Sequence, residues 1–202
     1  MKSLYALLFL ICMTFSLYGQ QNDEDNDEYQ TIIGSDDLTV SGFGGPVMTF
    51  SSFDNDFALF MGGGGAALIN NRFFFGGFGQ GMTNSASISD TILNKNYDKI
   101  EFGYGGIWLG YMFNANKAIH PVLHTQIGFG GISYQNSVNN SDRNDPVLVL
   151  APGLEIEMNV TNFFKLGAGV KYRYVLGVDE GDYTSSDFSS LGGFLTFKFG
   201  WF

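Results

Sequence analysis

The stretch from Phe164 to Tyr174 alternates between two kinds of side chain. Apolar and aromatic side chains hold every second position: Phe164, Leu166, Ala168, Val170, Tyr172 and Tyr174. Cations and glycines hold the positions between them: Lys165, Gly167, Gly169, Lys171 and Arg173. A period of two is that of a β-strand, whose successive side chains point to opposite faces. Because Lys or Arg on a lipid-facing surface costs about 2–4 kcal/mol near the middle of a bilayer, the pattern predicts a transmembrane strand with its charges inward.

Seven further segments share this length and are rich in Phe, Tyr, Val, Leu and Gly. With the first stretch they give eight predicted strands, at 38–50, 56–69, 72–84, 99–113, 120–134, 146–158, 162–175 and 188–201. Eight is an even number and the smallest used by membrane barrels. We therefore predict an all-β fold, an eight-stranded antiparallel up-and-down transmembrane β-barrel.

The connections between these strands alternate in length. Short ones lie at 70–71, 114–119 and 159–161, and long polar ones at 85–98, 135–145 and 176–187; the connection at 51–55 is also short. Outer-membrane barrels have short periplasmic turns and longer external loops. The alternation thus predicts periplasmic termini, with the long loops on the cell surface.

The amino-acid composition differs from that of a domain that folds in water. Only 15% of its 202 residues are charged, against about 25% in an average soluble domain. It contains 28 Gly, 21 Phe and 10 Tyr, and its mean hydropathy of +0.04 excludes a helical membrane bundle. The formal net charge of −10 argues against a nucleic-acid partner.

The first residues are typical of an export signal. Residues 4–15 form an apolar run that is too short to span a membrane and fits a signal-peptide core. We predict a signal peptide at 1–19, an acidic disordered linker at 20–37 and the barrel at 38–202. Cys12 would leave with the signal peptide, and bulky Ile11 before it does not fit a lipoprotein motif.

Charged residues of three predicted strands are expected to share the inner face. In 146–158, Leu148, Leu150, Leu154, Ile156 and Met158 are predicted to face lipid, and Glu155 and Glu157 to face inward. In 99–113, Ile100, Phe102, Tyr104, Trp108 and Met112 are predicted to face lipid, opposite Lys99 and Glu101.

An eight-stranded barrel is only wide enough for side chains to fill it. The predicted filling is a structural ion-pair network, because buried charges need partners. Its members are Glu101, Glu155, Glu157, Lys165, Lys171, Arg173 and Lys198, with Arg72, His124 and Gln126 as further candidates. The hairpin at 159–161 should set both glutamates beside Lys165, and the last hairpin should bring Lys165 near Lys198.

Catalytic and metal sites find little support. The only histidines are His120 and His124, without an evident serine partner for a hydrolase. On a strand their spacing places them roughly 13 Å apart, too far for one metal ion. We predict neither enzymatic activity nor a cofactor. The acidic outer loops could share divalent cations with lipopolysaccharide, although a solvated surface that resists aggregation explains them more simply.

Four segments together suggest a known family: Gly19-Gln20, Pro152 to Asn162, Lys171 to Val175 and the final Phe-Lys-Phe-Gly-Trp-Phe202. With them the mature chain resembles the small outer-membrane barrels of OmpA/OmpX-like architecture, and in detail those of Bacteroidetes-type bacteria. The resemblance implies an assembly signal in the last strand, read by the barrel-assembly machinery. Its residues are Phe197, Phe199, Trp201 and Phe202.

Two details of this resemblance are specific to the chain. Phe202 belongs to the opposite phase from the other three aromatic residues of the signal, so the final Phe is displaced by one position. Asp90-Thr91-Ile92 looks like the acceptor for O-glycosylation in that phylum, on Thr91.

The leading hypothesis is an integral outer-membrane protein with a structural or surface-interaction role. The alternatives are a small-solute channel or transporter, an accessory subunit of a secretion or uptake complex, and a secreted barrel that binds an apolar ligand. The last would reverse the pattern of 164–174, with apolar residues inside. The sequence does not identify a protein partner.

Overall fold

The computed structural model describes residues 38–53, 56–83, 99–136, 141–178 and 184–202. The predicted signal peptide, the predicted linker and Thr91 lie outside these residues. The described chain forms eight strands: β1 Val40–Phe53, β2 Asp56–Ile69, β3 Phe73–Met82, β4 Lys99–Met112, β5 Ile119–Asn136, β6 Ser141–Asn159, β7 Phe164–Leu176 and β8 Ser190–Trp201. All eight were predicted, with boundaries that differ by a few residues.

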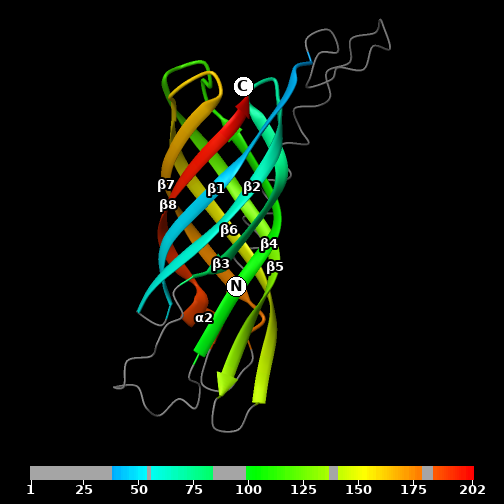
Figure 1. The fold of residues 1–202 in the computed structure, drawn as a ribbon, viewed down its shortest axis with the longest axis vertical. Helices are drawn as coiled ribbons and strands as arrows, with labels where there is room; N and C mark the ends of the chain where they lie inside the picture. Colours follow the sequence, from blue (N-terminus) through cyan, green and yellow to red (C-terminus); the bar gives the residue numbers. More distant parts are fainter. Residues whose placement is uncertain (1–37, 54–55, 84–98, 137–140, 179–183) are drawn as a thin grey trace, which may run out of the picture. The chain divides into compact units, whose positions relative to one another are not determined.

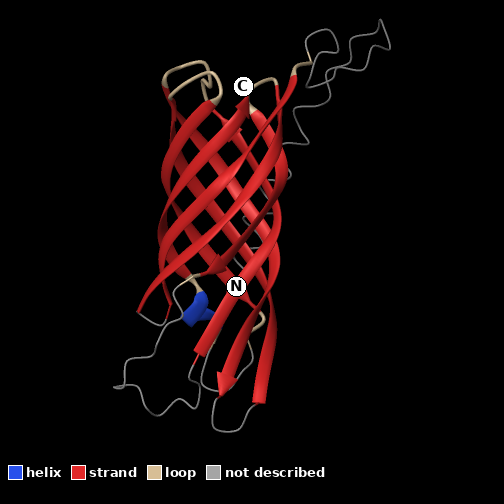
Figure 2. Cartoon of the chain, in the orientation of Figure 1, coloured by secondary structure: helices blue, strands red, loops and turns tan. Residues whose placement is uncertain are grey.

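The strands close into one barrel in sequence order (Figures 1 and 2). Each strand pairs antiparallel with the next, and β8 pairs back onto β1, with Trp201 opposite Gly42. The predicted eight-stranded antiparallel up-and-down barrel is therefore confirmed. The closure gives every strand a hydrogen-bonded neighbour on both sides.

The two ends of the barrel differ. At one end, called here the turn end, short turns join β2 to β3, β4 to β5 and β6 to β7 (Figure 1). Asn70, Asn71 and Asn114 have φ of 51°, 53° and 52° in these turns, a left-handed conformation that asparagine tolerates better than other non-glycine residues. The opposite end, called the loop end, carries the remaining connections. There β5 and β6 continue to Asn136 and Ser141, which pair, so the third outer loop is shorter than predicted.

The outer face of the barrel is apolar. In β6 and β7 the side chains that the sequence assigns to lipid are the exposed ones, with Leu154, Ile156 and Val170 each 52% exposed. Glu155, Glu157, Lys165, Lys171 and Arg173 are buried inside. The predicted orientation of these two strands is confirmed.

The predicted orientation of β4 is wrong. Ile100, Phe102, Tyr104, Trp108 and Met112 are buried in the barrel interior. Glu101 is exposed on the outer face near the loop end, so it does not join the inner charges. The other phase of β4 holds Gly103, Gly105 and Ile107, and glycines cannot supply the volume that the interior needs. The need to fill the interior with bulky side chains therefore determines which face of β4 points inward. The position of its charged residues does not.

Prolines interrupt the ladders without shifting them. Pro46 pairs with β2, but the β1–β8 ladder is broken beside it between Gly44 and Val47. The β6–β7 ladder is likewise broken between Leu150 and Gly153, around Pro152. The register is the same on both sides of each gap, so these two prolines mark neither a bulge nor a strand end. A missing N–H removes a ladder bond on one side only. Pro121, the third residue of β5, does lie near a strand end.

One helical turn, α2 Ser185–Phe188, precedes β8. Its first residues, with Thr184, form a capping box in which the Asp187 carboxylate accepts from the backbone N–H of Thr184 at 2.7 Å. Within the described ranges no helix is long and apolar enough to cross a membrane.

The inward orientation of β4 predicts that truncating an inward side chain lowers the free energy of unfolding far more than truncating an outward one. Trp108→Ala should lower the free energy of unfolding by about 3–5 kcal/mol, because it empties a packed interior site. Ile107→Ala is the matched control, because Ile107 is adjacent and 44% exposed on the outer face. Denaturant unfolding of the refolded protein measures both losses. Equal losses, or a larger loss for Ile107→Ala, would contradict the inward orientation of β4.

Candidate functional site: the barrel interior

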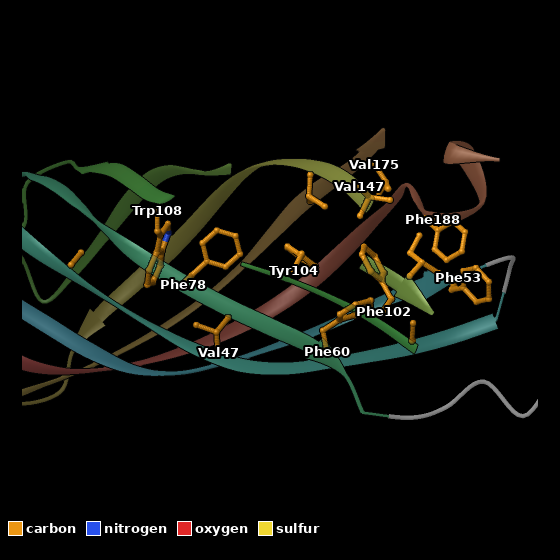
Figure 3. Packing of buried hydrophobic residues seen from close by; sticks show 14 of the residues in the cluster. Val47, Phe53, Phe60, Phe78, Phe102, Tyr104, Trp108, Val147, Val175 and Phe188 are labelled. Atoms are coloured by element: carbon orange, nitrogen blue, oxygen red, sulfur yellow. The ribbon is translucent and has the colours of Figure 1, made fainter. Parts of the chain in front are cut away.

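Apolar and charged side chains divide the barrel interior. Strands β1 to β4 contribute large aromatic residues, among them Phe43 and Phe74. Phe60, Phe102 and Trp108 belong to the same group and are labelled in Figure 3. Strands β6 to β8 contribute all the charged residues that are buried in the described chain: Glu155, Glu157, Lys165, Lys171, Arg173 and Lys198. The cations therefore lie opposite aromatic rings.

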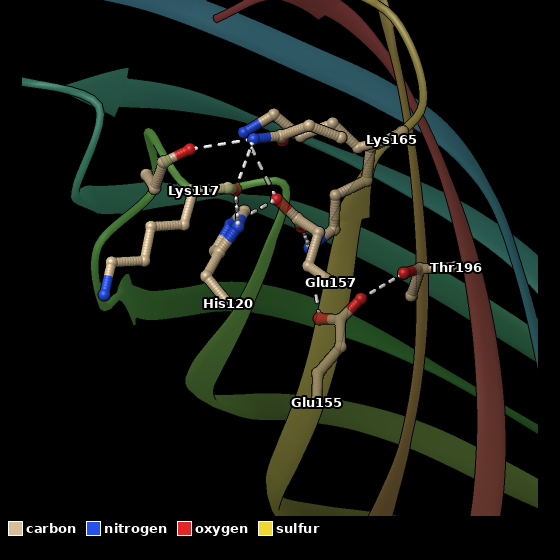
Figure 4. Close-up of polar contacts among 9 residues, drawn as sticks. Lys117, His120, Glu155, Glu157, Lys165 and Thr196 are labelled. Atoms are coloured by element: carbon tan, nitrogen blue, oxygen red, sulfur yellow. Dashed lines mark hydrogen bonds and ion pairs between the residues drawn. The ribbon is translucent and has the colours of Figure 1, made fainter.

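Both interior glutamates bind lysines toward the turn end (Figure 4). Lys198 Nζ lies 3.0 Å from Glu155 Oε2 and 2.5 Å from Glu157 Oε2. Lys165 Nζ lies 3.2 Å from Glu157 Oε1, and His120 Nε2 lies 3.1 Å from the same oxygen. Removing one partner from such a buried cluster leaves an uncompensated charge, which typically costs 3–5 kcal/mol.

Strand register explains why these five groups meet. Glu157 is opposite Gly167 on β7 and opposite His120 on β5. Lys165 is opposite Lys198 on β8. Gly167 leaves space beside Glu155, whose Oε1 accepts a hydrogen bond from Thr196 Oγ1.

Farther along the barrel, Lys171 binds neutral partners. Its Nζ donates to Gln126 Oε1 at 3.0 Å and to Gln80 Oε1 at 3.4 Å. Gln80 Nε2 also donates to Gln126 Oε1, and Thr49 Oγ1 donates to Gln80 Oε1. These four side chains make a polar layer between the glutamate cluster and the loop end.

Arg173 holds the loop end together. Its guanidinium donates to Phe188 O, Ser51 Oγ, Ser52 O and Ser190 Oγ at 3.0–3.2 Å. Its Cζ also lies 4.4 Å from the centroid of the Phe60 ring, a contact worth about 2 kcal/mol when desolvated. No carboxylate among the described residues forms an ion pair with Arg173 or Lys171.

The predicted members of the network thus have different environments. Glu155, Glu157, Lys165 and Lys198 lie together, whereas Lys171 and Arg173 lie farther along with polar and aromatic partners. Arg72 is exposed in the β2–β3 turn, and Glu101 lies on the outer face. Sequence reasoning missed His120, which it placed at the start of the fifth predicted strand and left out of the interior network. The one available signal was its spacing of four residues from His124, which places both histidines on the same face of β5.

His124 is buried next to Trp108, whose Nε1 donates to His124 Nδ1 at 3.3 Å. This contact fixes the imidazole ring against the aromatic half of the interior. In the described part of the chain no three His, Cys, Asp or Glu residues are grouped in a way that could hold a metal ion.

The aromatic residues of the last strand lie on both faces. Phe199 and Trp201 are exposed on the outside, at 42% and 78%. Phe202 follows the inner phase, where its ring stacks on Phe43 at 6.2 Å and Lys165 Nζ lies 4.1 Å from its centroid. The displaced phase of Phe202 thus turns its ring inward, where it packs against Phe43 and Lys165 at the turn end.

The fold and its two faces define a small closed barrel with an apolar exterior and a filled, partly charged interior. No known protein family and no curated protein matches the sequence. Among solved structures, the neisserial surface protein NspA is similar at a TM-score of 0.51 and 15% identity, with 80% of this chain and 95% of that chain covered. Ail of Yersinia pestis is also similar, with a TM-score of 0.45, 15% identity and the same coverage. At this identity the likeness to NspA, an eight-stranded outer-membrane barrel, extends to the fold.

The space at Gly167 gives a test of the glutamate cluster. A Cβ at this position would overlap Glu155 Oε1 and Thr196 Oγ1, so Gly167→Ala should displace Glu155 from Lys198 and cost about 2–3 kcal/mol of unfolding free energy. Gly79→Ala is the matched control, because a Cβ at Gly79 has no atom within 4 Å. Unfolding curves in urea compare the two variants. A loss at Gly167 no greater than that at Gly79 would contradict this packing.

Proposed function

We propose that the chain is an integral outer-membrane β-barrel with a structural or surface-interaction role and no catalytic activity. The observation that carries the proposal is the surface. Apolar side chains cover the outside of β6, β7 and β8, and the buried charges of these strands point inward. In water this arrangement would expose an apolar surface on a monomer, whereas in lipid it is the stable one.

The filled interior supports a role that does not depend on transport. Trp108, Arg173, Lys198, Phe60 and Phe74 are among the largest side chains with less than 2% exposure. Burial of such large side chains indicates an interior that is filled by the protein itself. A small-solute channel would need these groups to move, and an accessory role in a larger complex would use the outer face or the loops.

The partners proposed for this protein follow from its surfaces. Outer-membrane lipids would contact the apolar face, and lipopolysaccharide would surround the loop end. The barrel-assembly machinery would read the last strand, where Phe197, Phe199 and Trp201 form one outward row and Phe202 packs inside.

Membrane residence predicts a defined behaviour on fractionation. The full-length protein, expressed in a Gram-negative host, should sediment with outer membranes and migrate faster on a gel before heating than after it, because a closed barrel resists unfolding by detergent. Recovery of the mature protein from the soluble periplasmic fraction would overturn the proposal.

Two matched variants test whether the outer face contacts lipid. Leu154 lies on the outer face and pairs with Val170, the middle residue of β7, whereas Leu176 lies on the outer face at the loop-end terminus of β7. In lipid vesicles, Leu154→Lys should cost about 2–4 kcal/mol of unfolding free energy and Leu176→Lys about 0–1 kcal/mol, because the cost depends on depth in the bilayer. Equal costs would contradict a bilayer around this face.

The filled interior predicts that the barrel does not conduct. Protein reconstituted into planar bilayers should show no steady single-channel current, since Lys198 and Arg173 are held by several partners each. A steady current that is abolished by a bulky substitution on the inner face would favour the channel alternative.

A further inference from the structure

A pocket of about 690 Å³ lies at the turn end of the barrel. Asparagines make up half of its twelve lining residues: Asn70, Asn71, Asn114, Asn116, Asn159 and Asn162. They come from the three short turns, which are far apart in the sequence and converge at this end (Figure 1). The pocket is thus a concave surface built from amide groups.

The fold requires only some of these asparagines. Asn70, Asn71 and Asn114 adopt left-handed φ, and Asn159 Nδ2 donates to the carbonyls of Ala115 and Lys117 at 3.0 and 2.8 Å. Asn116 and Asn162 are exposed, and neither makes a side-chain hydrogen bond within the described chain. Their amides, each able to donate and accept, are available to a ligand.

Positive charge accompanies the amides. Arg72 lines the pocket from the β2–β3 turn, is exposed, and forms no ion pair within the described residues. Lys165 lines its inner part and contacts Glu157 of the interior cluster. No acidic side chain lines the pocket. Arg72 is therefore the cation of the lining that has no ion-pair partner among the described residues.

An aromatic ring completes the lining. Phe202 contributes to the pocket, and its ring is fixed by Phe43 and Lys165. Amides that donate and accept, an apolar ring and one cation match a sugar with hydroxyl and acetamido groups, an apolar face and a carboxylate.

We propose that the turn-end pocket binds an acidic, N-acetylated glycan, with Arg72 on its carboxylate and Asn116 and Asn162 on its hydroxyl or acetamido groups. The assignment rests on the proposed function, because outer-membrane residence places the turn end in the periplasm, where the cell-wall glycan lies. It adds a ligand to a barrel whose filled interior has no room for one.

The test is a titration of the full-length mature protein in detergent micelles with the disaccharide of N-acetylglucosamine and N-acetylmuramic acid. Chitobiose is the neutral comparison and inorganic phosphate the comparison for a simple anion. Saturable binding of the acidic disaccharide is expected by calorimetry. It should be about tenfold tighter than binding of chitobiose, equivalent to about 1.4 kcal/mol, because only the former has a carboxylate.

Arg72→Gln should remove this tenfold preference while leaving the weaker binding of chitobiose in place. Lys117→Gln is the matched control: it removes an exposed cation of the neighbouring turn that does not line the pocket, and it should change neither affinity. Asn116→Ala with Asn162→Ala should weaken both disaccharides. Heat-modifiable migration confirms that each variant is folded.

Three results would overturn the glycan site: no saturable binding of the acidic disaccharide, an equal effect of Lys117→Gln and Arg72→Gln, or phosphate binding as tight as that of the disaccharide. Binding in micelles does not depend on the membrane in which the protein resides. Fractionation therefore tests the proposed function separately, and failure of one proposal is distinguishable from failure of the other.

Discussion

Pairing of β8 with β1 is the constraint on which the rest of the structure depends. Once the ladder is closed, each strand has a hydrogen-bonded neighbour on both sides, and each strand has one face inside and one outside. Eight strands enclose a space that side chains must fill. The composition of the inner face is therefore set by volume as much as by polarity, which is why aromatic rings and cations share it.

The interior cations are stabilised in two ways. Four buried cations face two buried carboxylates, so ion pairing alone cannot compensate them. Lys165 and Lys198 use Glu155 and Glu157, whereas Arg173 uses four oxygen acceptors and the face of Phe60. Such partners cost less desolvation than a further buried carboxylate would. The aromatic residues of β2 to β4 allow this second mode, because Arg173 reaches the rings of Phe60 and Phe102 across the barrel and Lys198 reaches those of Phe74 and Trp108.

The sequence predicts strands and pairings better than it predicts strand phase. In β7 three cations share one face of the strand, so only the orientation with that face inside the barrel is compatible with lipid. In β4 the apolar residues of one phase compete with Ile107, Leu109 and the glycines of the other, and one glutamate is a weak guide because Glu101 lies near a strand end. The contact of Lys165 with Glu157 followed from hairpin register, whereas the contact of Lys198 with both glutamates and the role of His120 depend on side-chain reach across the closed barrel. The turn-end pocket was also beyond prediction, because it is formed by three turns that only the closed fold brings together.

The two ends of the barrel have opposite properties. At the loop end, Phe188 of α2 is 1% exposed and packs against Phe53 at 4.6 Å between ring centroids, while Arg173 binds its carbonyl oxygen; this end of the interior is covered by the chain itself. At the turn end, Phe202 and Lys165 close the interior but leave a polar pocket outside them. Arg173 binds groups of β1, α2 and β8 at the loop end, and Lys165 contacts Glu157 and the ring of Phe202 at the turn end, so side chains occupy the interior at both ends. A ligand at the turn end would contact the barrel without entering it.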